Sequence, residues 1–389
     1  MNPTLDNTDY KEIAPFDDIE FKEKMEALVA EPGFEHAVRY VMPHIDFQNF
    51  TEQLKQISDK DSFQIQIMRP FLEMLAEKTS AGVTMSNIER ISRSGRYTFI
   101  TNHRDIVLDA SFLNLMFIRN NYPTSEVAIG NNLLIYDWIT DLVKLNKSFI
   151  VKRNLRMTQA LQAARQLSGY IHYAINQKNQ SVWIAQREGR AKDSNDLTQE
   201  SLLKMLALAG DEDIIESLKK INICPVSISY EFDPNDYLKA REFLLKRKDP
   251  EFKKSQRDDL FSMETGLLQY KGRIHFDVAG PITDRIDAID RSLDKTEVIH
   301  QVAGIIDNCI HSGYKIYPIN YIAYDRLSDS TRFADKYADE DVATIDNYVK
   351  QQLNKVDIED ISAEDFDYMQ IKIYEMYANP LRNKLAATK

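Results

Sequence analysis

The stretch YTFITNHRDIVLDASF, residues 97–112, joins a short apolar run to a cluster of polar side chains. Residues 97–101 are mostly aromatic or β-branched, which favours a buried strand, and residues 110–118 have the apolar face of a helix. Between them lie Asn102, His103, Arg104 and Asp105, with Asp109 at the predicted helix start. Ligands of open α/β sheets bind at the carboxyl ends of the strands. The stretch therefore predicts a functional site in the loop after this strand.

His103 is the candidate general base of this site. An imidazole abstracts a proton well when a carboxylate holds its other nitrogen in one tautomer. Asp105 and Asp109 both lie within six residues of His103, and either could serve. The alternative interpretation is that His103 only hydrogen-bonds the loop.

Composition narrows the class of protein. A chain of 389 residues with 43% hydrophobic residues can bury a sizeable core in one large domain or two. Its 49 basic and 60 acidic residues give a net charge of -11, which argues against nucleic acid as a partner. Cys224 and Cys309 are too few for a disulfide framework and lack zinc-site spacing, so we expect no metal and a reducing compartment.

The sequence also bears on localisation. No basic segment followed by an apolar run is visible near residue 1, so we expect no secretory signal. The most apolar stretches fall short of the roughly 20 residues that span a bilayer. We therefore expect a cytoplasmic protein whose membrane contact, if any, is peripheral and on the cytoplasmic face.

Periodicity divides the chain into three parts. Residues 1–80 form a predicted helical N-terminal region, in which we expect residues 1 to about 16 to be disordered or loosely packed and helical periodicity to start after them. Residues 326–389 form a helical tail that is strongly acidic over residues 334–367. In residues 81–325, short apolar strands alternate with helices, which predicts an α/β domain with a mostly parallel open sheet flanked by helices. The predicted strands are residues 97–101, 126–129, 148–151, 181–185, 223–230 and 273–279.

Three later polar blocks follow or form predicted strands. The block KRNLR (152–156) offers guanidinium groups that suit phosphate or carboxylate, and REGRAK (187–192) combines Gly189 with charged neighbours. CPVSISYE (224–231) is a strand whose proline marks its start. Taken singly, the first two are as well explained by exposed basic residues and a turn with a surface salt bridge. Their shared position after strands suggests that they converge on His103.

Together these blocks resemble the glycerolipid acyltransferase family. NHRDIVLD (102–109) stands where that family has its His and Asp motif, FIVKR (149–153) its arginine motif, REGRAK its Glu-Gly-Arg motif and CPVSISYE its proline-containing strand. The resemblance covers residues 97–231. AIGNNL (128–133), followed by FIVKR, is most similar to the glycerol-3-phosphate acyltransferase branch.

The resemblance implies transfer of a fatty acyl group from acyl-CoA or acyl carrier protein to a hydroxyl of glycerol 3-phosphate in phospholipid synthesis. It implies His103 as base, with Asp109 orienting it and Asp105 in reserve. The expected acceptor-binding residues are Arg153, Glu188, Gly189, Arg190 and Lys192. No cofactor beyond the acyl donor is implied. No G-x-S-x-G motif is visible, so we expect direct transfer without an acyl-enzyme.

Two departures leave alternatives open. Five residues separate His103 from Asp109, where the family usually has four, and REGRAK lacks the proline often found before the Glu. The acceptor could instead be 1-acylglycerol 3-phosphate or an amino-acid lipid, or the protein could bind lipid without turnover. The kinase-like HRD at residues 103–105 fails on context, because Ala110 stands where that loop needs Asn.

One further stretch suggests a docking surface. Residues 237–257 contain 8 basic and 3 acidic residues in an otherwise acidic chain. An apolar stripe of Leu238, Phe243, Leu244 and Leu245 would let a helix here rest on an anionic bilayer or receive an acidic acyl carrier protein. The plain alternative is a solvated helix.

Overall fold

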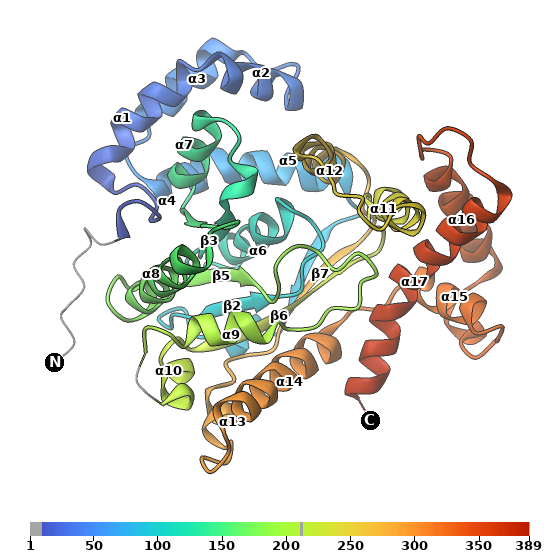
Figure 1. The fold of residues 1–389 in the computed structure, drawn as a ribbon. Coiled ribbons are helices and arrows are strands. Elements are labelled where there is room, and N and C mark those ends of the chain that lie inside the picture. Colours follow the sequence, from blue (N-terminus) through green and yellow to red (C-terminus); the bar gives the residue numbers. More distant parts are fainter. Residues whose placement is uncertain (1–9, 211–212, 389) are drawn as a thin grey trace.

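A computed structural model describes residues 10–210 and 213–388. The strands of this part form one open seven-stranded sheet in the order β1-β7-β6-β2-β5-β3-β4 (Figure 1). Strands β6, β2, β5, β3 and β4 are mutually parallel, while β7 is antiparallel to β6 and parallel to β1. The strands are β1 (Val83–Ser86), β2 (Thr98–Thr101), β3 (Glu126–Gly130), β4 (Ser148–Val151), β5 (Val182–Ala185), β6 (Ile223–Tyr230) and β7 (Ile274–Val278).

The predicted fold class, a mostly parallel open sheet flanked by helices, is confirmed. All six predicted strands occur, with ends that differ by one residue at most. Edge strand β1 was not predicted. Its four residues give little periodicity, and its partner β7 is distant in sequence.

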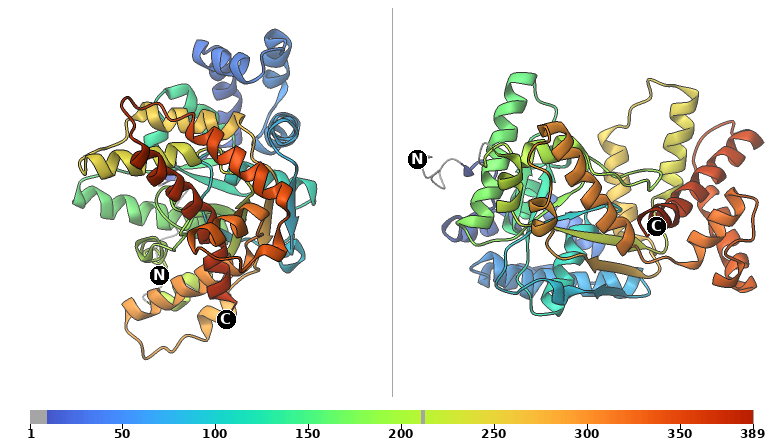
Figure 2. Two further views of the ribbon diagram at one scale, coloured as in Figure 1. Left: turned by 90° about the vertical axis from the view of Figure 1, so that its right-hand side faces the viewer. Right: turned by 90° about the horizontal axis from the view of Figure 1, so that it is seen from below.

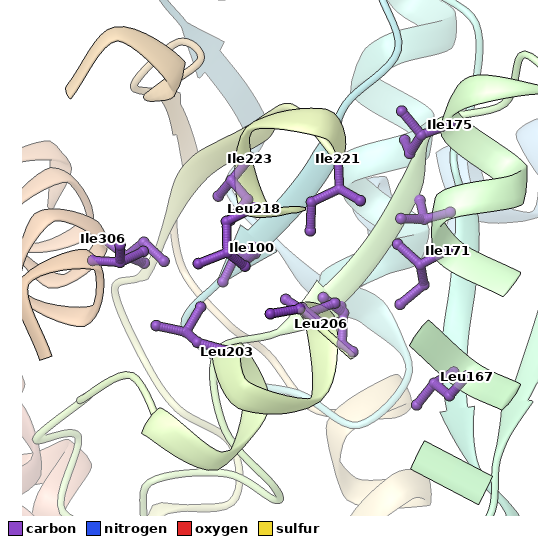
Figure 3. Packing of buried hydrophobic residues seen from close by; sticks show 14 of the residues in the cluster. Ile100, Leu167, Ile171, Ile175, Leu203, Leu206, Leu218, Ile221, Ile223 and Ile306 are labelled. Atoms are coloured by element: carbon purple, nitrogen blue, oxygen red, sulfur yellow. The ribbon is translucent and has the colours of Figure 1, made fainter. Parts of the chain in front are cut away.

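Alternation along the strands sends neighbouring side chains to opposite faces of the sheet. Phe99 of β2 packs with Leu72 of α5 (Arg69–Thr79) and Phe112 of α6 (Leu108–Arg119) on one face. Ile100 packs on the other face against α8 (Met157–Asn176), α9 (Glu200–Leu206), α10 (Ile214–Lys220) and α14 (Lys295–Gly313). Figure 3 shows this second cluster, with Ile100 among isoleucines and leucines of several elements. The sheet is therefore covered on both faces.

The N-terminal helices form a separate apolar cluster with α7 (Asp137–Leu145), in which Phe34 lies edge-on to Trp138. These helices lie beside α7, away from the sheet (Figure 1). They are α1 (Asp18–Val29), α2 (Pro32–Val41), α3 (Phe47–Gln56) and α4 (Lys60–Phe63); a π-helical turn, η2 (Gln64–Met68), joins α4 to α5. The predicted helix over residues 61–78 is thus one rod with a π turn. Its second half, with Leu72 and Leu75, packs on the sheet as expected, whereas Phe63 and Ile67 of its first half pack in the N-terminal cluster.

The C-terminal helices pack on α11 (Asp236–Lys248). Ala240 and Leu244 of α11 enter an apolar cluster with α15 (Pro318–Leu327), α16 (Asp339–Leu353) and α17 (Ala363–Ala387). At the same junction, the buried Asp236 carboxylate accepts hydrogen bonds from the Tyr348 and Tyr377 hydroxyls, each at 2.8 Å, and from Gln352 at 2.6 Å. This region is therefore attached through both apolar and polar contacts.

The remaining elements are one longer helix, α12, and several short ones. They are α12 (Gln256–Leu268), α13 (Thr283–Asp287), η3 (Ile88–Arg90), η4 (Asn131–Leu133) and η5 (Ala334–Lys336). Residues 237–257 do not form one helix, because α11 ends at Lys248 and α12 starts at Gln256. Among the residues described, none of the helices has the length and apolarity to cross a bilayer.

Candidate active site

His103 lies in the loop between β2 and α6, at the carboxyl edge of the sheet. Its Nδ1 atom is 2.8 Å from Oδ2 of Asp109, and the imidazole is edge-on to Trp183 of β5. Its side chain is 14% exposed and lines a large cavity. Because Nδ1 donates its proton to the carboxylate, the lone pair of Nε2 is left for a substrate hydroxyl.

Asp109, in the first turn of α6, is held firmly. Its Oδ2 also accepts the backbone N–H groups of Arg104 at 2.6 Å and Asp105 at 3.0 Å. Three donors to one oxygen fix the position of the carboxylate. Asp109 therefore reaches His103 although five residues separate the two, one more than is usual in the glycerolipid acyltransferase family.

Asp105 makes no contact with His103. Its Oδ1 accepts the N–H groups of Val107 at 2.9 Å and Leu108 at 2.8 Å, which caps the start of α6. Burial and the neighbouring Asp109 raise the pKa of the Asp105 carboxyl. Gly266 of α12 approaches closely: a Cβ there would lie 2.0 Å from Oδ2 of Asp105. The structure therefore brings Asp109, and not Asp105, to the imidazole.

Arg104 points away from the cavity into the protein. Its Nη2 atom lies 2.7 Å from Oδ2 of Asp196, and both side chains are almost fully buried. The Tyr314 hydroxyl donates to the same carboxylate at 2.8 Å, and its ring lies beneath the Arg104 guanidinium. This ion pair connects the His103 loop to the segment after REGRAK.

Arg153 follows β4 and lies against the end of β3. A Cβ at Gly130 would come within 2.8 Å of the Arg153 Nε atom, so the missing side chain leaves room for the guanidinium. The Arg153 backbone N–H donates to Oδ1 of Asn131 at 2.9 Å. Glu188 lies 3.5 Å from Nη1 of Arg153. The arginine and Glu-Gly-Arg blocks therefore meet, as their shared position after strands predicts.

Gly189 has φ +69°, a left-handed conformation that favours glycine. It turns the chain between Glu188 and Arg190 at the edge of the cavity. Nε of Arg187 and Nη1 of Arg190 are buried and make no hydrogen bond within the described part of the chain. Buried guanidinium donors of this kind are suited to an anionic ligand.

Lys192 is placed differently from Arg190. Its ammonium group makes a very close ion pair with Glu242 of α11, and burial lowers its pKa. Lys239, one turn before Glu242, is buried and pairs with Asp233. Both lysines line the cavity. Lys192 therefore shares the Glu242 carboxylate with Lys246 and Lys254, whereas Arg190 retains a free donor.

These side chains surround one end of a cavity of about 1980 Å³. Its lining includes His103, Arg153, Glu188, Gly189, Arg190 and Lys192. The rest of the lining is largely apolar and comes from the N-terminal helices, α7, α8 and α12; it includes Phe34, Val41, Ile67, Trp138, Ala163 and Met263. A charged end joined to apolar walls suits a ligand with a phosphate and a hydrocarbon chain.

Sequence reasoning missed several parts of this arrangement. One is that Gly130 makes room for Arg153. A glycine at the end of a predicted strand was a signal that another group approaches the backbone closely there. The Arg104–Asp196 pair and the N-terminal cavity wall had no local signal, because their partners are distant in sequence. Among the described residues, no His, Cys, Asp and Glu cluster could hold a metal ion.

The comparison with protein families bears directly on the segment that carries these residues. Residues 82–229 match the family model Acyltransferase. This acyltransferase segment includes β1 to most of β6, and with them His103, Asp109, Arg153 and the REGRAK loop. The match spans less than half of the chain.

Two other comparisons add less to the acyltransferase match. No curated protein matches the chain significantly. Among solved structures, the 1-acyl-sn-glycerophosphate (LPA) acyltransferase PlsC from Thermotoga maritima is similar over 74% of this chain and 92% of that one, at 10% identity and a TM-score of 0.36.

Proposed function

We propose that the protein transfers a fatty acyl group from an acyl thioester to a hydroxyl of glycerol 3-phosphate. The observation that carries this proposal is the His103–Asp109 pair at a cavity with a cationic end and apolar walls. The family match over residues 82–229 supports acyl transfer as the reaction class. Acyl-CoA and acyl carrier protein are the proposed donors.

In the proposed reaction, Nε2 of His103 takes the proton of the acceptor hydroxyl as its oxygen attacks the thioester carbonyl. Asp109 stabilises the imidazolium that forms. The tetrahedral intermediate then collapses: the C–S bond breaks, an ester remains, and His103 returns the proton to the leaving thiolate. The step needs no oxidant, metal or covalent acyl-enzyme.

The acceptor phosphate would bind at Arg153 and Arg190. Glu188, beside Arg153, would orient that guanidinium, and Gly189 would allow close backbone approach to the ligand. Lys192 would contribute less to phosphate binding, because its ammonium group is already engaged by Glu242. The acyl chain would lie along the apolar walls.

The proposal is tested by mass-spectrometric product analysis. The purified chain is incubated with palmitoyl-CoA or palmitoyl acyl carrier protein and with glycerol 3-phosphate, 1-acylglycerol 3-phosphate or an amino-acid lipid. Formation of 1-acylglycerol 3-phosphate from glycerol 3-phosphate, lost in a folded His103→Ala variant, is the expected result. If only 1-acylglycerol 3-phosphate were acylated, the acceptor in this proposal would be wrong, while the acyl-transfer mechanism would still hold. Lipid binding with no product from any pair would contradict enzymatic function.

A further inference from the structure

Positive charge is strongly segregated along this chain. Residues 142–187 hold eight Lys and Arg residues and no Asp or Glu. Since the whole chain carries -11, the remaining residues carry a net charge of -19 (-11 - 8). Such a segment presents positive charge to an anionic partner where its cations are exposed and not paired with carboxylates from elsewhere in the chain.

Four of the eight cations of this segment pair with carboxylates from elsewhere in the chain. Lys147 pairs with Asp61, Lys152 with Glu12, Arg153 with Glu188 and Lys178 with Glu126. Arg156 and Arg165, in contrast, are exposed and form no ion pair with any residue that the structure describes. The exposed cations of the segment that lack an acidic partner among the described residues are thus Arg156, at the N-cap of α8, and Arg165, within it.

The first turns of α8 also expose apolar side chains. Met157 is 90% exposed and Leu161 is 51% exposed, and every residue from 156 to 162 is exposed. Arg156 is the N-cap residue, gives no side-chain cap, and no acidic residue follows in the first turn. A cation at the positive end of a helix dipole is unfavourable in isolation, and an anionic surface would relieve this.

This end of α8 projects beside the cavity. Helix α8 and the α11–α12 pair extend in the same direction from the sheet (Figure 2, right). Ala160 of α8 and Leu260 of α12, both exposed, line the same cavity, which therefore reaches the surface between the two helices. Phe261 of α12 is 48% exposed. Exposed apolar groups thus flank the cavity on both sides.

The basic stretch of residues 237–257 has more of its positive charges paired with carboxylates than the start of α8 does. Arg247 pairs with Glu364 at 2.5 Å, and Lys248 with Asp365 at 2.7 Å, both at the start of α17. Lys246 lies 3.0 Å from Glu242. The acidic tail therefore matches part of this stretch, and α8 is the better docking element.

We propose that residues 156–165 of α8 dock the protein on an anionic lipid bilayer. Met157 and Leu161 would enter the headgroup region, while Arg156 and Arg165 contact lipid phosphates. Exposed apolar side chains between cations favour a bilayer over an acidic protein, which would leave Met157 without an apolar phase. Docking in this orientation turns the cavity towards the membrane. The inference concerns membrane binding and does not depend on the proposed acyl transfer.

The test is flotation of the full chain with two kinds of vesicle, pure phosphatidylcholine and equal parts of phosphatidylcholine and phosphatidylglycerol. We expect binding to the anionic vesicles. Met157→Ser with Leu161→Ser should weaken it about tenfold or more at every salt concentration, because the loss is hydrophobic. Arg156→Gln with Arg165→Gln should weaken it roughly thirtyfold at low salt, a difference that fades as salt is added.

Matched variants on remote surfaces control for general changes. Phe366→Ser with Ile371→Ser removes two exposed apolar residues from α17, and Lys78→Gln with Lys295→Gln removes two exposed cations. Both should bind vesicles like the wild type. Equal binding by the α8 variants and the wild type would overturn the proposal. The proposal would also be overturned if the arginine variant bound vesicles normally but used carrier-protein thioesters, and not CoA thioesters, more slowly. That result would mean that the arginines bind acyl carrier protein.

Discussion

Arg104 and Asp196 form a buried ion pair, 2.7 Å from Nη2 to Oδ2, directly behind the proposed general base. Removing one partner leaves an uncompensated buried charge, which costs about 3–5 kcal/mol. Asp196→Asn should therefore lower the free energy of unfolding strongly in urea titrations. The double change Arg104→Met with Asp196→Leu should cost less than either single loss of charge. A single variant as stable as the wild type would show that the pair is not part of the core.

The His103–Asp109 pair predicts a steep loss of turnover. His103→Ala and Asp109→Asn should each lower kcat by about 10²–10⁴-fold, because both the base and its orientation are lost. Acyl-transfer rates at saturating substrates measure this, with circular dichroism to confirm folding. Wild-type rates in a folded His103→Ala protein would remove it as the base.

Asp105 predicts the opposite pattern. Since its carboxylate caps α6, Asp105→Ala should cost about 1 kcal/mol of stability. Asp105→Asn keeps an acceptor oxygen for Val107 and Leu108 and should stay close to the wild type in both stability and kcat. Comparison of Asp105→Asn with Asp109→Asn in one assay separates the carboxylates. A larger kcat loss in Asp105→Asn would reverse their roles.

Arg153 and Arg190 should act on the acceptor. Loss of one charge-assisted hydrogen bond costs about 1.5–3 kcal/mol, so Arg153→Ala and Arg190→Ala should each weaken acceptor binding roughly ten- to hundredfold. Steady-state kinetics with donor and acceptor varied separately will show whether KM for the donor is unchanged. Arg332→Ala, an exposed change outside the cavity lining, is the control. Unchanged acceptor kinetics in both site variants would argue against a phosphate clamp.

Asp236 predicts a pH dependence of stability. Burial raises the pKa of its carboxyl from 3.8 to about 7. The folded state then binds more protons than the unfolded state between these values, so this group's stabilisation is lost as pH rises through the window, by up to about 1.4 kcal/mol per pH unit. In Asp236→Asn, the free energy of unfolding measured by urea titration should therefore depend less on pH over that range than it does in the wild type. If the free energy of unfolding changes with pH in the same way in both proteins, Asp236 titrates normally.

The sequence predicts those parts of the fold that have local patterns. The strands β2 to β7 are short apolar runs bounded by polar residues, and His103 and Asp109 lie on either side of a helix start. The different roles of the two carboxylates could also be predicted in part, since Asp105 precedes Leu108 by three residues, as a helix cap does. The departure from the family spacing nevertheless kept Asp105 in reserve.

Other features depend on contacts that no local pattern encodes. The pairing of Lys192 with Glu242 joins residues on separate elements, and it shows that a lysine in a predicted binding motif can already be engaged by a carboxylate. The cavity wall from α2 and α3 depends on how these helices pack on α7. Periodicity indicated an apolar face for the N-terminal region but not which residues would line a cavity. The three-part division of the chain stays a prediction.

The strand order also constrains when the protein can fold during synthesis. Central strand β2 pairs with β6, Thr98 opposite Ile223, and edge strand β1 pairs with β7, Val83 opposite Ile274, a separation of 191 residues (274 - 83). A nascent chain that has passed β5 therefore still exposes one side of β2 and all of β1. Such unpaired edges aggregate readily. We expect fragments that end before β7 to leave these edges unpaired and therefore to aggregate.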